Sequence, residues 1–360
     1  MRRALLFLAL VACRRDGPAA DAAVPDAGIA VEAPRDATVD VGAPAPAAPI
    51  VDAGKPLPAR AKLAGLAKGA VIAASNGQEH VVTAEAETPV LIASFTKLFV
   101  AVATLRLVAR GIYGLDDTVK TLLPALASRP WSDSTVRELL THTSRVPEFD
   151  EGHGYYRKDG VDFGDPVAVL AKELSASATE KRGVWKYRNA EFALLGAILQ
   201  ERAGKPTAEV LANEVFTPAR MHHAGILVAG KPPSGLDLAP MGAIRPQNFF
   251  VAGNGYASPE DLLAFLDALG DDTLLDGASR ELLFTGTKER KGGAMGCWSY
   301  PFGGQRMVER PGGFGNIRLV SAFFPDERRA IVAWSKDAPE LGRPRDAKSA
   351  AAALARVLAE

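Results

Sequence analysis

Ser94 and Lys97 lie three positions apart at the start of a strongly apolar stretch, in the motif Ser-Phe-Thr-Lys. Residues three apart share one face of a helix, so the two side chains would be neighbours. A serine hydroxyl becomes a good nucleophile when a base takes its proton, and a buried lysine can be that base because desolvation lowers its pKa. The spacing occurs once in the sequence, and one such match is expected by chance, so the pair is a candidate that needs support from elsewhere.

A second candidate group is Tyr187-Arg188-Asn189, directly before the apolar run of residues 190–203. Tyrosine can act as an acid or a base when nearby cations lower its pKa, and asparagine offers both a donor and an acceptor. The simpler alternative is a helix-capping asparagine beside a half-buried tyrosine.

A third candidate group, Arg310-Pro311-Gly312-Gly313, comes at the end of a predicted strand. A cation at a strand edge, followed by glycines, allows a substrate carboxylate and its backbone to approach closely. The alternative is a glycine-rich bulge between two strands.

In their order and contexts, these three groups resemble the serine β-lactamase and penicillin-binding-protein superfamily, in its class C-like branch. The resemblance covers nearly all of residues 62–360. Further segments are similar to family motifs: residues 139–144 (Leu-Leu-Thr-His-Thr-Ser), 187–204, 216–221, and 254–258 with Asp261. Because these motifs are long, the chain is identified as a member of this superfamily.

The resemblance implies a covalent mechanism. Ser94 would attack a carbonyl group and form an acyl-enzyme, while Lys97 and Tyr187 would shuttle the proton. Asn189 would hold Lys97 and bind the substrate amide. Neither a cofactor nor a metal ion is implied.

The resemblance also implies which groups face the substrate. The backbone N–H groups of Ser94 and Gly313 would form the oxyanion hole, where donors act on the charge that develops in the transition state. Arg310 and Gly312 would bind substrate, with Arg310 facing either a substrate carboxylate or Tyr187.

The sequence departs from the family pattern near the expected site. Arg310 and Pro311 stand where the family carries Lys or His and then threonine; arginine keeps its proton, and proline removes a hydroxyl. Arg188 replaces a small residue and is expected to narrow the cleft or reach for an acidic substrate. These changes favour an esterase or D-amino-acid peptidase over a strong β-lactamase. The alternative is a non-catalytic binding or sensor module, and the four intact motif residues weigh against it.

The elements that position these groups follow from periodicity and turn signals. Strands are predicted at 70–74 and 80–83, around an Asn-Gly hairpin turn, and at 307–310, 317–324 and 329–335. Helices are predicted at 91–111, where the pattern is amphipathic, and at 165–174, 190–203, from 258, and at 345–360.

The predicted fold class is α/β (α+β): an antiparallel sheet built from the N- and C-terminal segments, flanked by helices, with a mostly helical inserted subdomain, as in the β-lactamase/transpeptidase fold. The hydrolase domain is expected at residues 61–360. Its sheet part is expected at about 61–93 and 285–360, and its helical part at about 94–284.

The N-terminal residues are typical of an exported protein. Arg2 and Arg3 precede a short uncharged run that ends in Leu10-Val11-Ala12-Cys13 and resembles the lipobox of bacterial lipoproteins. This resemblance implies a signal peptide at residues 1–12 and a lipid on Cys13. Residues 13–60 are rich in Ala, Pro and Asp and are predicted to be a semi-stiff linker, because prolines and small side chains cannot build a packed core.

The expected location is therefore the bacterial cell envelope, where the lipid would anchor the protein to a membrane, either the outer membrane or the periplasmic face. The expected partners are that membrane and a small-molecule or peptidoglycan-like acyl substrate.

The composition excludes several other classes. Lys and Arg number 42 against 42 Asp and Glu, a balance that argues against nucleic acid as a partner. The two cysteines, Cys13 and Cys297, exclude a disulfide scaffold, and no Cys/His cluster suits structural zinc. His142 is predicted to be structural, His80 to be solvated, and Cys297 to be a buried apolar residue.

Overall fold

The structure of the protein is a computed structural model. It describes residues 55–67, 69–150, 152–178, 181–228, 232–238, 245–336, 341 and 347–359. Cys13, the expected signal peptide and most of the expected linker lie outside the described residues, so their assignments stay predictions.

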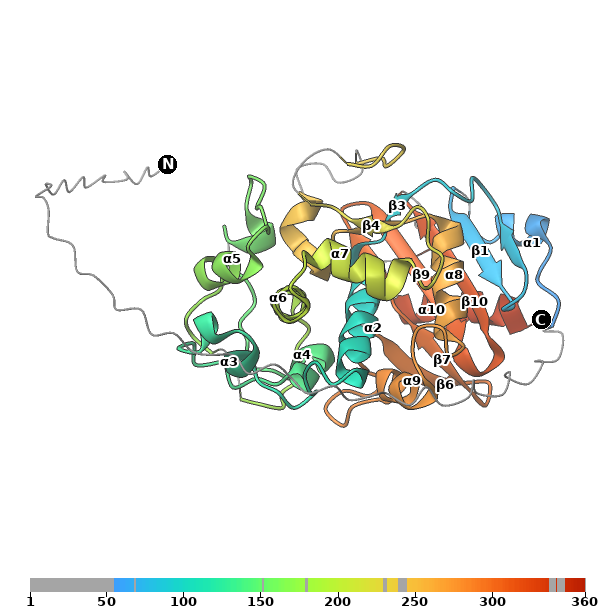
Figure 1. Cartoon of the computed structure of the whole chain (residues 1–360). Helices are drawn as coiled ribbons and strands as arrows, with labels where there is room; N and C mark the ends of the chain where they lie inside the picture. The colour runs from blue at the N-terminus through green and yellow to red at the C-terminus, as the bar shows by residue number, and fades with distance from the viewer. Residues whose placement is uncertain are drawn as a thin grey trace, which may run out of the picture. The chain divides into compact units, whose positions relative to one another are not determined.

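Within the described ranges, the main sheet has seven antiparallel strands, contributed by segments from both ends of the domain (Figure 1). The strand order is β2 (His80–Val82), β1 (Val71–Ser75), β10 (Arg329–Ser335), β9 (Ile317–Phe324), β7 (Gln305–Glu309) and β6 (Trp298–Phe302); β8 (Gly312–Phe314) also pairs with β9. The Asn-Gly turn joins β1 to β2, and β1 pairs in register with β10. The predicted sheet, assembled from N- and C-terminal segments, is confirmed.

Both faces of this sheet are buried. Ala73, Val332 and Phe323 point into the larger core, whereas their neighbours Ile72 and Ile331 point into a second core on the opposite face. Helix α8 (Pro259–Leu269) packs near β1 and β10, and α10 (Ala347–Ala359) packs against β9 and β10. Strands covered on two faces are apolar at successive positions, which explains why the strand signal near the C-terminus is strong.

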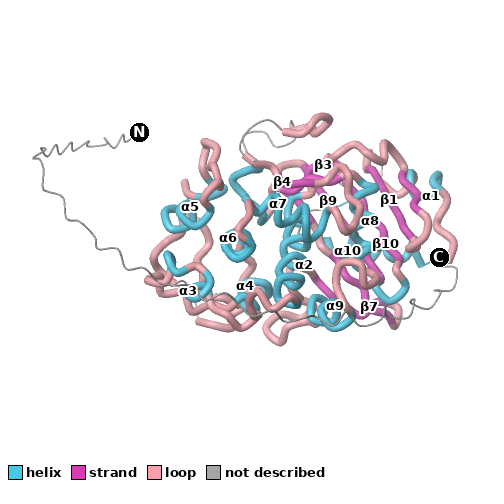
Figure 2. Tube along the Cα trace, in the orientation of Figure 1, coloured by secondary structure: helices cyan, strands magenta, loops and turns pink. Residues whose placement is uncertain are grey.

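Helices occupy the chain between the two sets of strands (Figure 2). They are α2 (Thr96–Ala109), α3 (Val119–Leu122), α4 (Val136–Thr141), α5 (Pro166–Glu173), α6 (Asn189–Ala203), α7 (Thr207–Leu211), α8 and α9 (Gly277–Phe284), with α1 (Arg60–Ala64) before β1. A small sheet of β3 (Val90–Leu91), β5 (Gly255–Ala257) and β4 (Gly225–Ile226) lies among them.

Capping residues set the ends of several helices as their sequences predict. Asp165 accepts a hydrogen bond from the Ala168 backbone at the start of α5, and Ser258 forms a capping box with Asp261 at the start of α8. Gly204 ends α6 in the left-handed conformation.

The predicted helix at 91–111 begins later than expected. Residues 90 and 91 form strand β3, a single 3₁₀ turn (η1, Ala93–Phe95) follows, and α2 begins only at Thr96. Nearly every residue of α2 is buried, so it is a central core helix and its predicted amphipathic character is wrong. Strands β6 and β8 and helices α4, α7 and α9 were not predicted, because their apolar patterns are short.

His80 is not solvated as predicted. Its Nδ1 lies 2.5 Å from the Glu260 carboxylate and its Nε2 lies 2.7 Å from the Asp267 carboxylate, which ties β2 to α8. Burial lowers the pKa of His80, but the two carboxylates outweigh burial and raise it above its ordinary value.

Candidate active site

Ser94 lies on the η1 turn, directly before the N-terminus of the buried helix α2. The preceding residue, Ala93, has a φ of 47°, which is unfavourable for any residue with a Cβ atom. Thr96 holds this conformation, because its hydroxyl donates to the Ala93 carbonyl at 2.6 Å and accepts from the Gly255 backbone at 3.0 Å. The serine is thus presented from a rigid, strained turn.

Strand β8 packs against this turn at Gly312. A Cβ atom at Gly312 would lie 2.2 Å from the Ile92 carbonyl oxygen, so only glycine permits this approach. Gly312 was predicted to bind substrate; in the structure, its visible role is to let the backbone before Ser94 pack closely. Gly313 follows it and pairs with Arg318 of β9. The substrate-binding and oxyanion-hole roles of these two glycines stay predictions.

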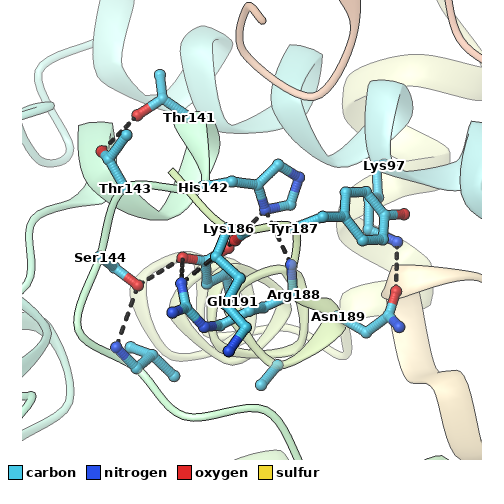
Figure 3. A network of polar contacts seen from close by, with 12 residues as sticks. Lys97, Thr141, His142, Thr143, Ser144, Lys186, Tyr187, Arg188, Asn189 and Glu191 are labelled. Atoms are coloured by element: carbon cyan, nitrogen blue, oxygen red, sulfur yellow. Dashed lines mark hydrogen bonds and ion pairs between the residues drawn. The ribbon is translucent and has the colours of Figure 1, made fainter. Parts of the chain in front are cut away.

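Three side chains meet around Ser94: Lys97, which lies one turn further along the chain, and Tyr187 and Asn189, which come from a distant stretch of sequence. Figure 3 shows the Lys97 amine against the Asn189 side chain. The Ser94 hydroxyl lies 2.8 Å from the Tyr187 hydroxyl. The Lys97 amine lies 3.2 Å from the Ser94 hydroxyl and donates to the Asn189 side-chain oxygen at 2.7 Å. It also donates to the backbone carbonyl of Ala252 at 2.5 Å. The structure therefore brings Ser94, Lys97, Tyr187 and Asn189 into one hydrogen-bonded cluster.

Arg310 joins the cluster from the sheet. It occupies the break between β7 and β8, where its backbone N–H donates to the Ser321 hydroxyl. Its guanidinium donates to the Ser94 carbonyl at 2.7 Å and to the Tyr187 hydroxyl at 2.9 Å. Of the two predicted orientations, the structure adopts the one toward the tyrosine.

The pKa values of Lys97 and Tyr187 are both lowered toward neutrality. Complete burial lowers the pKa of Lys97 to about 8, and the Arg310 charge acts in the same direction, although Tyr187 opposes it. Burial alone would raise the pKa of Tyr187, but the Lys97 and Arg310 cations outweigh it and lower the value to about 8. Either group can therefore take up a proton near neutral pH.

Glu148 is a site residue that the sequence reasoning missed. Its carboxylate accepts hydrogen bonds from the Asn189 backbone at 2.7 Å and the Ala190 backbone at 3.2 Å, and so caps the N-terminus of α6. The alternative in which Asn189 caps its own helix is wrong, because its side chain binds Lys97 instead. No spacing signal reveals this cap, which comes from 41 residues upstream.

Arg188 does not reach into the cleft as predicted. Its side chain is buried, and its guanidinium lies 3.7 Å from the Glu191 carboxylate. The backbone at Arg188 is extended, and side chains alternate along an extended chain. Since Tyr187 and Asn189 face Ser94, the residue between them points into the interior.

Nowhere in the described part of the chain do three or more His, Cys, Asp or Glu side chains gather as a metal site requires. Cys297 lies directly before β6 and is buried, as predicted, and burial raises the pKa of its thiol to about 12. Among the helices in the described ranges, none is long and apolar enough to cross a bilayer.

Comparison with known families agrees with this geometry. The family model described as Beta-lactamase matches residues 55–356. The chain belongs to the beta-lactamase family. The predicted membership in the serine β-lactamase and penicillin-binding-protein superfamily is thereby confirmed.

Curated members of the family match over most of the domain. The putative penicillin-binding protein PbpX of Bacillus subtilis is 28% identical over 269 residues, which is 72% of this chain and 64% of that protein. Esterase EstB of Burkholderia gladioli is 31% identical over 247 residues, which is 55% of this chain and 63% of that protein. The chain thus spans somewhat less than two thirds of each relative's length.

Solved structures of similar proteins share the fold. A penicillin-binding protein from Bacillus halodurans superposes with a TM-score of 0.66 at 22% identity, covering 82% of this chain and all of the other. The D-amino acid amidase of Ochrobactrum anthropi SV3, complexed with D-phenylalanine, gives 0.67 at 18% identity, with 82% and 95% covered. The predicted β-lactamase/transpeptidase-like fold is confirmed.

Replacing Gly312 by alanine tests the close packing behind Ser94. The new methyl group would collide with the Ile92 carbonyl oxygen, and overpacking of this kind costs about 1–3 kcal/mol. We expect Gly312→Ala to lower the free energy of unfolding by at least this amount in urea titrations. The control is Gly277→Ala, where a Cβ atom meets nothing within 4 Å and stability should stay unchanged or rise slightly. Equal effects of the two substitutions would contradict the packing argument.

Proposed function

We propose that this protein is a serine hydrolase that forms a covalent acyl-enzyme at Ser94. The observation that carries the proposal is the contact of one serine hydroxyl with both a phenol, at 2.8 Å, and an amine, at 3.2 Å, whose pKa values are each lowered to about 8. Acyl transfer requires a nucleophile beside a base whose pKa lies near the pH at which the enzyme works.

In the proposed reaction, the Ser94 oxygen attacks the substrate carbonyl carbon while its proton passes to the Tyr187–Lys97 pair. The leaving group takes that proton as its bond to the carbonyl carbon breaks. Water then attacks the acyl-enzyme and gives one proton to the same pair. The pair passes this proton to the Ser94 oxygen as its bond to the carbonyl carbon breaks, which releases the acid and the free serine. Arg310 keeps its charge throughout and stabilises negative charge on the Tyr187 oxygen.

The backbone N–H groups of Ser94 and Gly313 are proposed to bind the oxyanion of the tetrahedral intermediate. Support comes from the packing of β8 directly against η1, which places the two backbones side by side. The N-terminus of α2 adds the positive end of a helix dipole beside the reacting atoms.

A non-catalytic binding or sensor module is the competing interpretation. The binding of a ligand does not require a buried lysine with two acceptors besides the serine, nor a tyrosine held between two cations. Burying an ammonium group lowers the stability of the fold, and a binding module gains nothing from it in return. The buried Lys97 therefore favours catalysis.

The substrate class favoured by the site is an ester or amide of an amino acid with a free amine. Arg310 already donates to Ser94 and Tyr187, and Pro311 offers no hydroxyl, so a β-lactam carboxylate finds few donors there. The half-buried Glu148 carboxylate, beside Asn189, supplies a negative charge for an ammonium group near the reacting carbonyl. The esterase relative and the D-amino acid amidase neighbour fit this class, and D-configured substrates are the first choice.

Substrate assays with Ser94→Ala test the proposal. We expect wild-type residues 61–360 to hydrolyse p-nitrophenyl esters and D-amino acid amides, and the variant to lose this activity by at least about 10³-fold, since its nucleophile is gone. The panel compares D- with L-amino acid substrates, free amines with N-acetylated amines, and both with a chromogenic cephalosporin. Free amines should react faster than acetylated ones. If wild type and Ser94→Ala behave alike on every substrate, the binding-module interpretation replaces the enzyme.

We further propose that the hydrolase is tethered in the bacterial envelope through a lipid on Cys13. The supporting features are Arg2 and Arg3, the short uncharged run up to Ala12, and the proline-rich stretch that follows the cysteine. A spacer of this composition would hold the catalytic domain away from the membrane surface.

Fractionation of cells that express the full chain tests the tether. Wild-type protein should sediment with membranes, and globomycin should cause the unprocessed precursor to accumulate. Cys13→Ser removes the sulfur that would carry the lipid and should release the protein into the soluble fraction. A Cys297→Ser variant serves as the control and should stay with the membranes. Unchanged membrane retention of Cys13→Ser would refute the anchor.

A further inference from the structure

A buried polar cluster lies directly behind Tyr187, on the side away from Lys97 (Figure 3). It consists of His142, Ser144, Arg188 and Glu191, and all four side chains are almost completely buried. The His142 ring lies 4.6 Å from the Tyr187 ring, measured between centroids. The acyl-transfer steps described above use none of these four residues.

His142 contacts the backbone on both sides of Tyr187. The Lys186 N–H donates to the His142 carbonyl at 2.9 Å, and the Arg188 backbone nitrogen lies 3.4 Å from the His142 Nδ1 atom. The residues before and after the tyrosine therefore both contact His142 through their backbone nitrogens. His142 adopts a φ of 59° at the end of α4, a strained conformation for a residue with a side chain.

Glu191 holds the imidazole in place. Its Oε2 atom lies 2.5 Å from His142 Nδ1, and its Oε1 atom accepts from the Ser144 hydroxyl at 2.5 Å and lies 3.7 Å from the Arg188 guanidinium. Glu191 lies in the first turn of α6, the same turn that carries Asn189. The cluster thus links α4, the loop before α6 and α6 itself behind the proposed proton acceptor.

The charges around Tyr187 are arranged unequally. Lys97 and Arg310 lie near its ring and hydroxyl, and Arg188 and Glu191 lie behind it. Burial raises the pKa of Glu191 well above its ordinary value, although Ser144 and Arg188 oppose the shift. Glu148 lies beside Asn189, and its negative charge favours the charged form of Lys97. Burial, reinforced by the nearby cations, lowers the pKa of His142 well below its ordinary value, so the imidazole adds no charge of its own.

We propose that His142, held by Glu191, is a positioning residue that keeps the Tyr187 hydroxyl against Ser94, Lys97 and Arg310. This inference rests on the proposed function, because it assumes that Tyr187 takes part in proton transfer. A misplacement of about 1 Å at such a group can cost on the order of 10²-fold in rate.

The test replaces His142 by asparagine, which tolerates the left-handed conformation and keeps the backbone carbonyl but lacks the ring. Tyr187 is titrated by near-ultraviolet difference absorbance, with the same protein carrying Tyr187→Phe as the blank. In wild type the phenol should titrate near the value of about 8. In His142→Asn it should titrate closer to the ordinary tyrosine value of about 10, because the hydroxyl moves away from its two cations.

The rate should change together with the titration. We expect kcat/KM for a responsive ester to fall on the order of 10²-fold at pH 8 in His142→Asn, with its pH profile displaced in the same direction as the titration. Glu191→Gln keeps the shape of the side chain and should produce a smaller shift in the same direction. It also serves as the second variant if His142→Asn does not fold.

His80→Asn is the matched control, because His80 also contacts a carboxylate but lies between β2 and α8. It should unfold more easily and leave the Tyr187 titration unchanged. If a folded His142 or Glu191 variant is less stable but titrates like wild type, the cluster is only structural and the inference is wrong.

The titration needs no substrate, which separates this inference from the proposed function. A shifted titration without Ser94-dependent hydrolysis would support the positioning role and refute the enzyme. Ser94-dependent hydrolysis with an unshifted titration would support the enzyme and refute the positioning role of His142.

Discussion

The buried amine of Lys97 is the constraint on which the rest of the site depends. Taking an ammonium group out of water costs several kcal/mol unless acceptors replace the lost hydration. The protein supplies three acceptors, from Ser94, Asn189 and Ala252, which come from different parts of the chain. The same burial lowers the pKa of Lys97 to about 8 and makes the amine a possible proton acceptor. The same buried environment therefore fixes the position of the Lys97 amine and lowers its pKa.

The two parts of the fold supply different components of the site. The sheet contributes a permanent cation, Arg310, at the break between β7 and β8, together with the close packing of Gly312 against the turn that carries Ser94. The helical insertion contributes Tyr187 and Asn189, whose positions depend on the start of α6 and its Glu148 cap. Without the sheet, Ser94 would lack Arg310, and without the helical insertion it would lack Tyr187.

Local signals in the sequence predicted much of the fold, and the family resemblance predicted most of the cluster. Helix caps, the Asn-Gly turn and apolar periodicity act over a few residues, so they can be read directly. The start of α2 was missed because tertiary contacts, through Thr96, impose a strained turn on an apolar stretch. Glu148 was missed because its partner, the start of α6, lies 41 residues away in the sequence. The burial of Arg188 was missed because it depends on the extended backbone between Tyr187 and Asn189, which turns the residue between them inward.

The most direct test of the central claim is the reaction of the protein with a fluorophosphonate, which needs no knowledge of the natural substrate. The serine oxygen bonds to phosphorus, fluoride leaves, and peptide mapping by mass spectrometry locates the adduct. The account predicts a single adduct on Ser94, formed at least about 10²-fold more slowly in Lys97→Met and in Tyr187→Phe. An adduct on another residue, or an unchanged rate in Lys97→Met, would contradict it.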